Sequence, residues 1–212
     1  RSKVYSLMGL SILAADAVST VSPTYAKEIL TPEYGFGLEG ALQRRQDDLY
    51  GILNGIDYGE FNPATDKLIP YRYDVDNLDD KAKDKAALLE KAGLNRSSGA
   101  PLAGMVGRLA DQKGLDLVAQ GLEPLLAETD IQFVLLGSGE EKYRAALDGL
   151  SAKYPSRMRL FQGLDLAQAQ LIYAGSDLFL MPSRYEPCGL GQMIALRYGT
   201  IPVVRQTGGL AD

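Results

Sequence analysis

The sequence predicts an α/β protein with a doubly wound, Rossmann-like parallel sheet in its C-terminal part. From Pro101 onward, short apolar runs alternate with segments of helical periodicity. This alternation is typical of a parallel sheet covered by helices on both faces, with right-handed crossovers. The composition agrees, because 46% hydrophobic and 23% charged residues in a chain of 212 are usual for a globular protein.

The expected strands are five apolar runs that each end at a glycine, a proline or a polar turn. They are Pro101–Gly107, Ile131–Gly137, Met158–Gln162, Leu178–Met181 and Ile201–Val204. Four helices are expected between them. In the first, Leu115, Val118 and Leu122 recur at helical spacing, and in the second Tyr143 and Leu147 do so. Each helix would therefore lay one apolar face on the sheet.

The part before residue 99 has a different pattern. Val18–Val21 is a short strand candidate, and residues 59–73 have the composition of a loop. Asn77 is expected to cap a charged helix with the body Lys81–Lys91, because Asp79 and Asp80 would then lie at the positive end of the helix dipole.

Parts of two domains, joined by a crossover, are expected along the chain. Residues 1–53 would end an N-terminal domain, residues 54–98 would form a crossover with the charged helix, and residues 99–212 would form the Rossmann-like domain. The polar stretch Asn95–Gly99 marks the entry to that last domain. The chain starts without methionine and stops at a glycine turn directly after a strand, so we expect it to be part of a larger protein.

Charge and composition exclude several functions. Twenty-two basic and twenty-seven acidic residues give a net charge of -5, so no positive field would attract nucleic acid or an anionic membrane. Histidine is absent, which excludes Ser-His-Asp and Cys-His catalysis and histidine zinc sites. The single cysteine, Cys188, cannot form an internal disulfide.

No apolar run reaches the ~18 residues of a membrane span. We expect a cytoplasmic protein.

The loop after the first expected strand is the first candidate site. In an open parallel sheet, ligands bind beyond the carboxyl ends of the strands. Arg108 stands at that strand end, and Lys113 stands at the start of the next helix. A guanidinium fork and a mobile ammonium could clamp a diphosphate and stabilise it as a leaving group. The alternative is a solvated pair of cations beside a helix N-terminus.

The loop after the fourth strand is the most informative segment. Backbone amides at Gly189, Leu190 and Gly191 would form an anion site at a helix start. Glu186 could accept hydrogen bonds from sugar hydroxyls, or it could merely favour the dipole of its own helix. Cys188 is expected to be a packing residue, since no histidine can activate it.

The glycine turns after the second and fifth strands are weaker signals. Gly137, Ser138 and Gly139 lack the rest of a dinucleotide fingerprint, so a tight turn is favoured there. Thr207, Gly208 and Gly209 would form a second backbone cradle at the fifth strand, and taken alone they form only a turn.

Together these motifs resemble the bacterial and plant glycogen (starch) synthase family. The matching segments are Asp16–Glu28, Leu53–Asp57, Gly107–Gly114, Ser183–Leu190 and Arg197–Asp212. The resemblance implies a two-domain glycosyltransferase of the GT-B type, in the cytoplasm or in a plant plastid. It implies a retaining transfer of glucose from ADP-glucose to the non-reducing end of an α-1,4-glucan, without a metal or another cofactor.

The resemblance also implies roles for individual residues. Arg108 and Lys113 match the cations on the donor diphosphate, and Glu186 matches the carboxylate against the transferred glucose. The substrate-binding set would comprise Asn54 in the crossover, Cys188, Gly189 and Leu190 on the phosphate side, and Thr207, Gly208 and Gly209 in the last turn.

Three departures from the family pattern leave alternatives open. The family's N-terminal half, with its KTGGL loop, is not in this chain, so we expect the isolated chain to turn over little or nothing. Leu164 stands where the family commonly has an aromatic residue, and Gly191 offers only backbone. The alternatives are a nucleotide-sugar or glucan binding module without catalysis, and another GT-B enzyme with a different donor, such as a sucrose or trehalose synthase.

Overall fold

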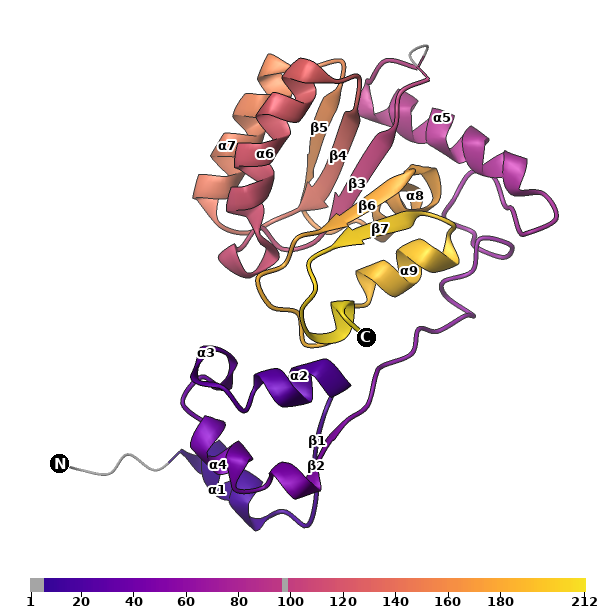
Figure 1. Ribbon diagram of the computed structural model, residues 1–212. Helices are drawn as coiled ribbons and strands as arrows, with labels where there is room; N and C mark the ends of the chain where they lie inside the picture. Colours follow the sequence, from indigo (N-terminus) through magenta and orange to yellow (C-terminus); the bar gives the residue numbers. More distant parts are fainter. Residues whose placement is uncertain (1–5, 97–98) are drawn as a thin grey trace. The chain divides into compact units, whose positions relative to one another are not determined.

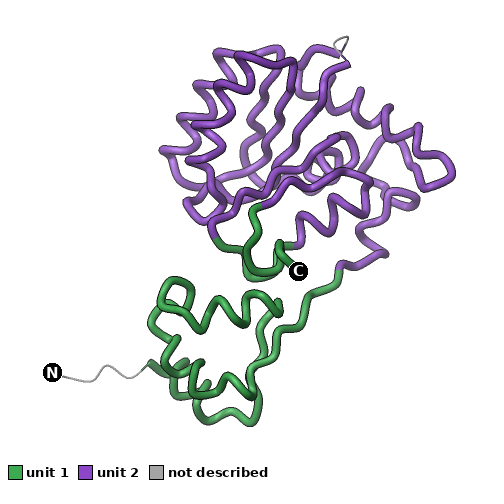
Figure 2. The backbone as a smooth tube through the Cα atoms, in the orientation of Figure 1, with its two compact units in different colours: residues 1–55, 185–189, 205–212 green, residues 56–184, 190–204 purple. Residues whose placement is uncertain are grey.

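The computed structural model describes residues 6–96 and 99–212, so Ser97 and Ser98 of the predicted polar stretch lie outside it. The chain divides into two compact units (Figure 2). The first unit comprises the described residues up to Gly55, with Tyr185–Gly189 and Arg205–Asp212, and the second comprises Ile56–Arg184 and Leu190–Val204. The domain limits expected at residues 53 and 98 stay a prediction.

The described part of the second unit contains a five-stranded parallel sheet with the order β5-β4-β3-β6-β7. The strands are β3 Leu102–Val106, β4 Gln132–Gly137, β5 Met158–Gln162, β6 Leu178–Met181 and β7 Ile201–Val204. The chain enters at the central strand, fills one side of the sheet and then crosses to the other side. This order confirms the doubly wound sheet and all five predicted strands.

Helices cover both faces of this sheet (Figure 1). The helices α6 Leu115–Glu128 and α7 Glu141–Lys153 cover one face, and α5 Lys81–Ala92, α8 Leu166–Gly175 and α9 Gly191–Arg197 cover the other. Ala103 and Met105 face the core under α6 and α7. Gly104 faces α8, where a Cβ atom would lie 2.4 Å from the Ser176 hydroxyl oxygen, so glycine lets α8 approach the central strand.

The start of the charged helix differs from the prediction. A 3-10 turn, η2 Leu78–Asp80, precedes α5, and α5 begins at Lys81. Asn77 is not the N-cap of α5, because its Oδ1 accepts a hydrogen bond from the Asp74 amide at 2.6 Å. The side chain of asparagine readily bonds to nearby backbone in this way, and the bond closes a local turn in place of a helix cap.

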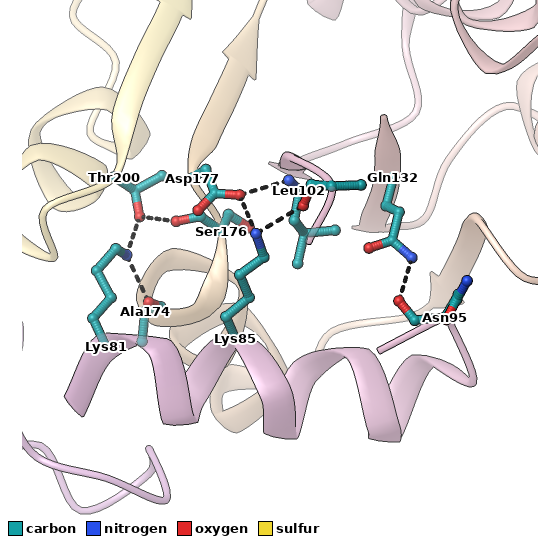
Figure 3. Close-up of polar contacts among 10 residues, drawn as sticks. Lys81, Lys85, Asn95, Leu102, Gln132, Ala174, Ser176, Asp177 and Thr200 are labelled. Carbon is teal, nitrogen blue, oxygen red and sulfur yellow. Dashed lines mark hydrogen bonds and ion pairs between the residues drawn. The ribbon is translucent and has the colours of Figure 1, made fainter. Parts of the chain in front are cut away.

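Two lysines one turn apart tie α5 to the sheet (Figure 3). The Lys81 ammonium donates to the Thr200 hydroxyl at 2.7 Å. The Lys85 ammonium pairs with Asp177 at 2.7 Å, and the same Asp177 oxygen accepts from the Leu102 amide at 2.7 Å. These partners lie at the amino ends of β3, β6 and β7, so the tie holds the edge opposite the predicted ligand loops. As predicted, residues 59–73 contain no helix or strand.

The first unit contains short helices around two parallel strands. Its described elements are α1 Leu7–Ala14, β1 Val18–Thr20, α2 Pro23–Glu28, α3 Pro32–Gly35, α4 Glu39–Gln43, the 3-10 turn η1 Gln46–Asp48, β2 Leu49–Gly51 and the 3-10 turn η4 Gly208–Leu210. β1 confirms the strand predicted at Val18–Val21. α2 starts at Pro23 because the Ser22 hydroxyl caps it, accepting from the Tyr25 amide at 2.8 Å.

Candidate functional site

The loop after β3 carries both predicted cations. Arg108 is exposed, and its guanidinium donates to the Gln112 side chain at 2.9 Å. Lys113 ends a 3-10 turn, η3 Asp111–Lys113, and Gly114 follows in the left-handed conformation with φ +68°. A Cβ atom at Gly114 would lie 2.2 Å from the Pro182 carbonyl oxygen, so only glycine fits this turn.

Backbone bonds join this loop to the loop after β4. The Leu109 amide donates to the Ser138 carbonyl at 2.9 Å, and the Glu140 amide donates to the Leu109 carbonyl at 2.8 Å. Asp111 accepts from the Tyr143 hydroxyl and the Lys142 ammonium, and these hydrogen bonds hold the pKa of Asp111 below its ordinary value. The loop that carries Arg108 is therefore fixed in shape.

The loop after β6 lies beside the loop after β3. The Arg184 amide donates to the Gln112 carbonyl at 2.8 Å, and the Arg184 guanidinium forms an ion pair with Asp116. Glu186 follows Arg184 by two residues. The sequence did not single out Arg184, because its partner Asp116 is 68 residues away and no local pattern connects them.

A hollow of about 180 Å³ opens in the second unit at the carboxyl ends of β3, β4 and β5. Its walls are Val106, Gly107, Arg108, Leu136, Gly137, Ser138, Gly163, Leu164 and Ala169. The lining surface is mostly apolar, and three of the wall residues are glycines without side chains. Leu164 is 91% exposed at this hollow. A flat apolar ring would fit here with its charged substituents beside Arg108.

The predicted residues of the first unit form a second group. Glu186 and Cys188 are 7% and 6% exposed. A Cβ atom at Gly208 would lie 1.9 Å from the Glu186 carbonyl oxygen, and one at Gly209 would lie 2.1 Å from the Cys188 carbonyl oxygen. The Gly209 amide donates to the Glu186 carbonyl at 3.1 Å. The two glycines therefore pack backbone against backbone on the Glu186 turn.

Three donors of the turn at residues 207–209, where a backbone cradle is predicted, have partners inside the protein. The Gly208 amide and the Thr207 hydroxyl both donate to Oε1 of Glu28 at 3.0 Å. With the Gly209 amide bonded to Glu186, these donors are engaged inside the protein. The sequence could not reveal Glu28, because it lies 179 residues from Thr207.

The turn into α9 combines two further predicted residues. Gly189 has φ +74°, Leu190 is the N-cap, and α9 begins at Gly191. Helix geometry leaves the amides of the first turn without partners inside the helix. The first turn of α9 holds no acidic residue, so a favourable helix dipole does not explain Glu186, which lies five residues earlier.

The predicted site residues thus fall into two groups. Arg108, Lys113 and Leu190 belong to the second unit, and Glu186, Cys188, Gly189 and the 207–209 turn belong to the first. Asn54, also in the first unit, is exposed and lies three residues after β2. The meeting of both groups around one ligand stays a prediction.

Among the described residues, no acidic or cysteine cluster could hold a metal, and no helix has the length and apolar character to cross a membrane.

Two family models match the chain. Residues 89–212 match the model described as glycosyl transferases group 1, and residues 2–44 match the starch synthase catalytic domain. The chain therefore belongs to the glycosyl transferases of group 1.

Comparison with individual proteins shows which members of this class the chain resembles. The chain is 55% identical over 210 residues to a glycogen synthase of Fervidobacterium nodosum, and the matched region makes up 99% of this chain and 43% of the relative. It is 55% identical over 207 residues to a glycogen synthase of Moorella thermoacetica, with 98% and 42% covered. The chain thus spans less than half the length of these relatives.

Solved structures agree with these relatives. The catalytic domain of starch synthase IV from Arabidopsis thaliana, bound to ADP and acarbose, superposes with a TM-score of 0.90 at 42% identity, covering 97% of this chain and 42% of that one. Anabaena HepE in complex with UDP-glucose has a TM-score of 0.63 at 18% identity, with 95% and 48% covered, and shares the fold alone. The predicted α/β fold of the GT-B type and the resemblance to glycogen and starch synthases are confirmed.

Proposed function

We propose that the full-length protein is a glycogen or starch synthase, a hexosyltransferase that moves glucose from ADP-glucose to the non-reducing end of an α-1,4-glucan. The observation that carries the proposal is the loop after β3, which sets Arg108 in the wall of an apolar hollow at the carboxyl edge of the sheet and carries Lys113 five residues further on, at the end of η3. The relatives called glycogen synthase and the starch synthase bound to ADP and acarbose support this donor and this acceptor.

The donor site follows from the chemistry of its residues. The hollow at Leu164 would take the base, and Arg108 and Lys113 would neutralise the diphosphate. Backbone at Cys188, Gly189 and Leu190 would contact the phosphate side. Because negative charge grows on the departing ADP, the two cations stabilise the transition state more than the ground state.

The transfer itself needs no protein base. In a front-face mechanism the bond from glucose C1 to the phosphate oxygen breaks, and the glucan 4-hydroxyl oxygen bonds to C1 from the same face. The released phosphate oxygen takes the hydroxyl proton, so a chain without histidine can support the step. Glu186 would hold hydroxyls of the transferred glucose, and Asn54 would lie on the acceptor side.

Radiolabelled glucose incorporation into glycogen by the full-length protein tests this proposal. Glu186→Ala and Lys113→Ala should each lower the rate by ~100-fold or more, the usual effect of losing a group that stabilises transition-state charge. Glu90→Ala and Lys153→Ala are matched controls, since both side chains lie on exposed helix surface and form surface ion pairs. Undiminished incorporation in both site variants would contradict the assignment.

A binding module without catalysis is the alternative that the same proteins can exclude. Such a module would saturate with ADP-glucose or a maltooligosaccharide in calorimetry and release no ADP, whereas the proposed enzyme releases one ADP for each glucose transferred. A cytoplasmic or plastid location remains a prediction.

A further inference from the structure

Glu28 stands out among the acidic residues of the first unit. It is the last residue of α2, and its Oε1 accepts two hydrogen bonds, one from the Thr207 hydroxyl and one from the Gly208 amide, both at 3.0 Å. Its Oε2 is buried and has no hydrogen-bond partner among the described residues. The carboxylate is therefore committed to the 207–208 backbone through one oxygen.

Local helix preference does not explain this placement. A carboxylate at the C-terminal end of a helix faces the negative end of the helix dipole, which is unfavourable. Burying an acceptor without a partner is also unfavourable. Side chains that break local rules in this way commonly serve a tertiary purpose. For Glu28, this tertiary role is to accept the two hydrogen bonds from the 207–208 turn.

A second carboxylate fixes the same loop at the other end of α2. Asp212 accepts from the Thr24 amide at 3.1 Å, from the Thr24 hydroxyl at 2.5 Å and from the Ser22 hydroxyl. Desolvation alone would raise the pKa of Asp212, but these hydrogen bonds hold it below its ordinary value. The segment 207–212 is therefore held at both ends by α2.

The 207–209 turn, which α2 holds in place, also fixes the backbone of Glu186. Gly208 and Gly209 are buried and touch the 186–188 backbone so closely that neither has room for a Cβ atom. The Gly209 amide is shared between the carbonyls of Glu186, at 3.1 Å, and Pro187, at 3.3 Å. A displacement of the 207–209 turn must therefore displace the backbone at Glu186.

We propose that Glu28 is a positioning residue for Glu186. Its carboxylate fixes Thr207 and Gly208. The adjoining Gly209 packs against the 186–188 backbone and donates a hydrogen bond to the Glu186 carbonyl, so the position of the turn determines the position of the Glu186 backbone. The inference rests on the proposed function, in which Glu186 contacts the transferred glucose. Loss of Glu28 should therefore lower kcat and leave the KM values for ADP-glucose and for glucan nearly unchanged.

Steady-state kinetics of the full-length protein test this role. Glu28→Ala removes both hydrogen bonds and should lower kcat between ~10-fold and ~100-fold, as small misplacements of a reacting group do. Glu28→Gln keeps an oxygen acceptor and should recover most of the rate. Glu33→Ala is the matched control, because Glu33 is an exposed acid of the neighbouring α3. A kcat for Glu28→Ala equal to that of Glu33→Ala would overturn the proposal.

The double variant Glu28→Ala/Glu186→Ala separates positioning from general destabilisation. If Glu28 acts through Glu186, the double variant should have the same kcat as Glu186→Ala alone. A further loss equal to that of Glu28→Ala in the native background would overturn the inference. If Glu186→Ala itself retained full activity, the proposed function would fail, which is a different result.

Hydrogen exchange covers the case in which Glu28→Ala does not fold. In Glu28→Gln, the weaker acceptor should make the Gly208 and Gly209 amides exchange somewhat faster than in the native protein, and kcat should fall slightly below the native value while most of the rate is recovered. Faster exchange at these amides with an unchanged kcat would also overturn the proposal.

Discussion

Burial changes the acid–base chemistry of Lys81. Its ammonium donates to the Ala174 carbonyl at 2.6 Å and to the Thr200 hydroxyl at 2.7 Å (Figure 3). Desolvation by burial lowers its pKa to about 8, and the charges of Asp177 and Asp84 only partly oppose that effect. Two neutral acceptors thus hold a charged group at the amino edge of the sheet.

The sign of the resulting pH dependence follows from this lowered pKa. The folded state loses the Lys81 proton near pH 8, whereas the unfolded state keeps it to about pH 10.5. Between these values the unfolded state binds more protons, so the free energy of unfolding rises with pH, by at most ~1.4 kcal/mol per pH unit. Urea unfolding should show native protein gaining stability over Lys81→Met from pH 8 to 10. A constant difference would contradict the lowered pKa.

Asp84 does not obscure that measurement. Burial raises its pKa to about 6, and the hydrogen bond from the Tyr71 amide opposes this effect. Asp84 is therefore ionised throughout the window from pH 8 to 10. Its own effect, a loss of stability as pH rises from about 4 to 6, lies below that window.

Single site residues were predictable to different degrees. Arg108 and Lys113 follow from the rule that ligands bind at the carboxyl ends of parallel strands. Glu28 does not, because its partners Thr207 and Gly208 are nearly the whole chain away. The engagement of the Thr207 hydroxyl and of the Gly208 and Gly209 amides inside the protein has the same cause, and a role of this turn in substrate binding stays a prediction.

At the scale of elements, glycine decides how closely α8 approaches β3. A Cβ atom at Gly104 would lie 2.4 Å from the Ser176 hydroxyl oxygen and 2.7 Å from a methyl carbon of Ile172. Both neighbours are fully buried, so neither can move away easily. The contact between helix and sheet therefore requires the absence of a side chain at this position.

Gly104→Ala should accordingly destabilise the protein by ~1–3 kcal/mol, the usual effect of overpacking a core. Gly121→Ala is the matched control, because Gly121 lies in α6 with nothing within 4 Å of a new Cβ atom. There the better helix propensity of alanine should stabilise by ~0.5–1 kcal/mol. Chemical denaturation measures both variants. Equal stability of Gly104→Ala and the native protein would contradict the close packing.

Elements with strong apolar runs were predictable, and helix starts were less so. The bounds of β5, β6 and β7 agree with the expected ones, because each strand is a short, mainly apolar run bounded by turn residues. The start of α5 was misplaced, because Asn77 bonds to the Asp74 amide and a 3-10 turn intervenes. Cap-forming residues also form turns, and sequence alone does not separate the two.

At the scale of the whole molecule, the strand order locates the ligand edge. β3 and β6 are neighbours, and their connections leave in opposite directions along the sheet. In a doubly wound fold a crevice forms where the order reverses, and here the loops with Arg108 and with Arg184 adjoin at that point. The membership of residues 185–189 and 205–212 in the first unit was not predictable, because it depends on contacts between segments far apart in the sequence, such as those of the 208–210 turn with α2 and of Gly209 with Glu186.

The central claim is that the loop after β3 binds the diphosphate of the donor. Calorimetric titration of the full-length protein with ADP and with AMP tests it directly, since the two ligands differ by one phosphate. The native protein should bind ADP at least ~10-fold more tightly, which corresponds to ~1.4 kcal/mol. Arg108→Ala/Lys113→Ala should lose this preference, and Lys153→Ala should keep it. An unchanged preference for ADP in the double variant would contradict the claim.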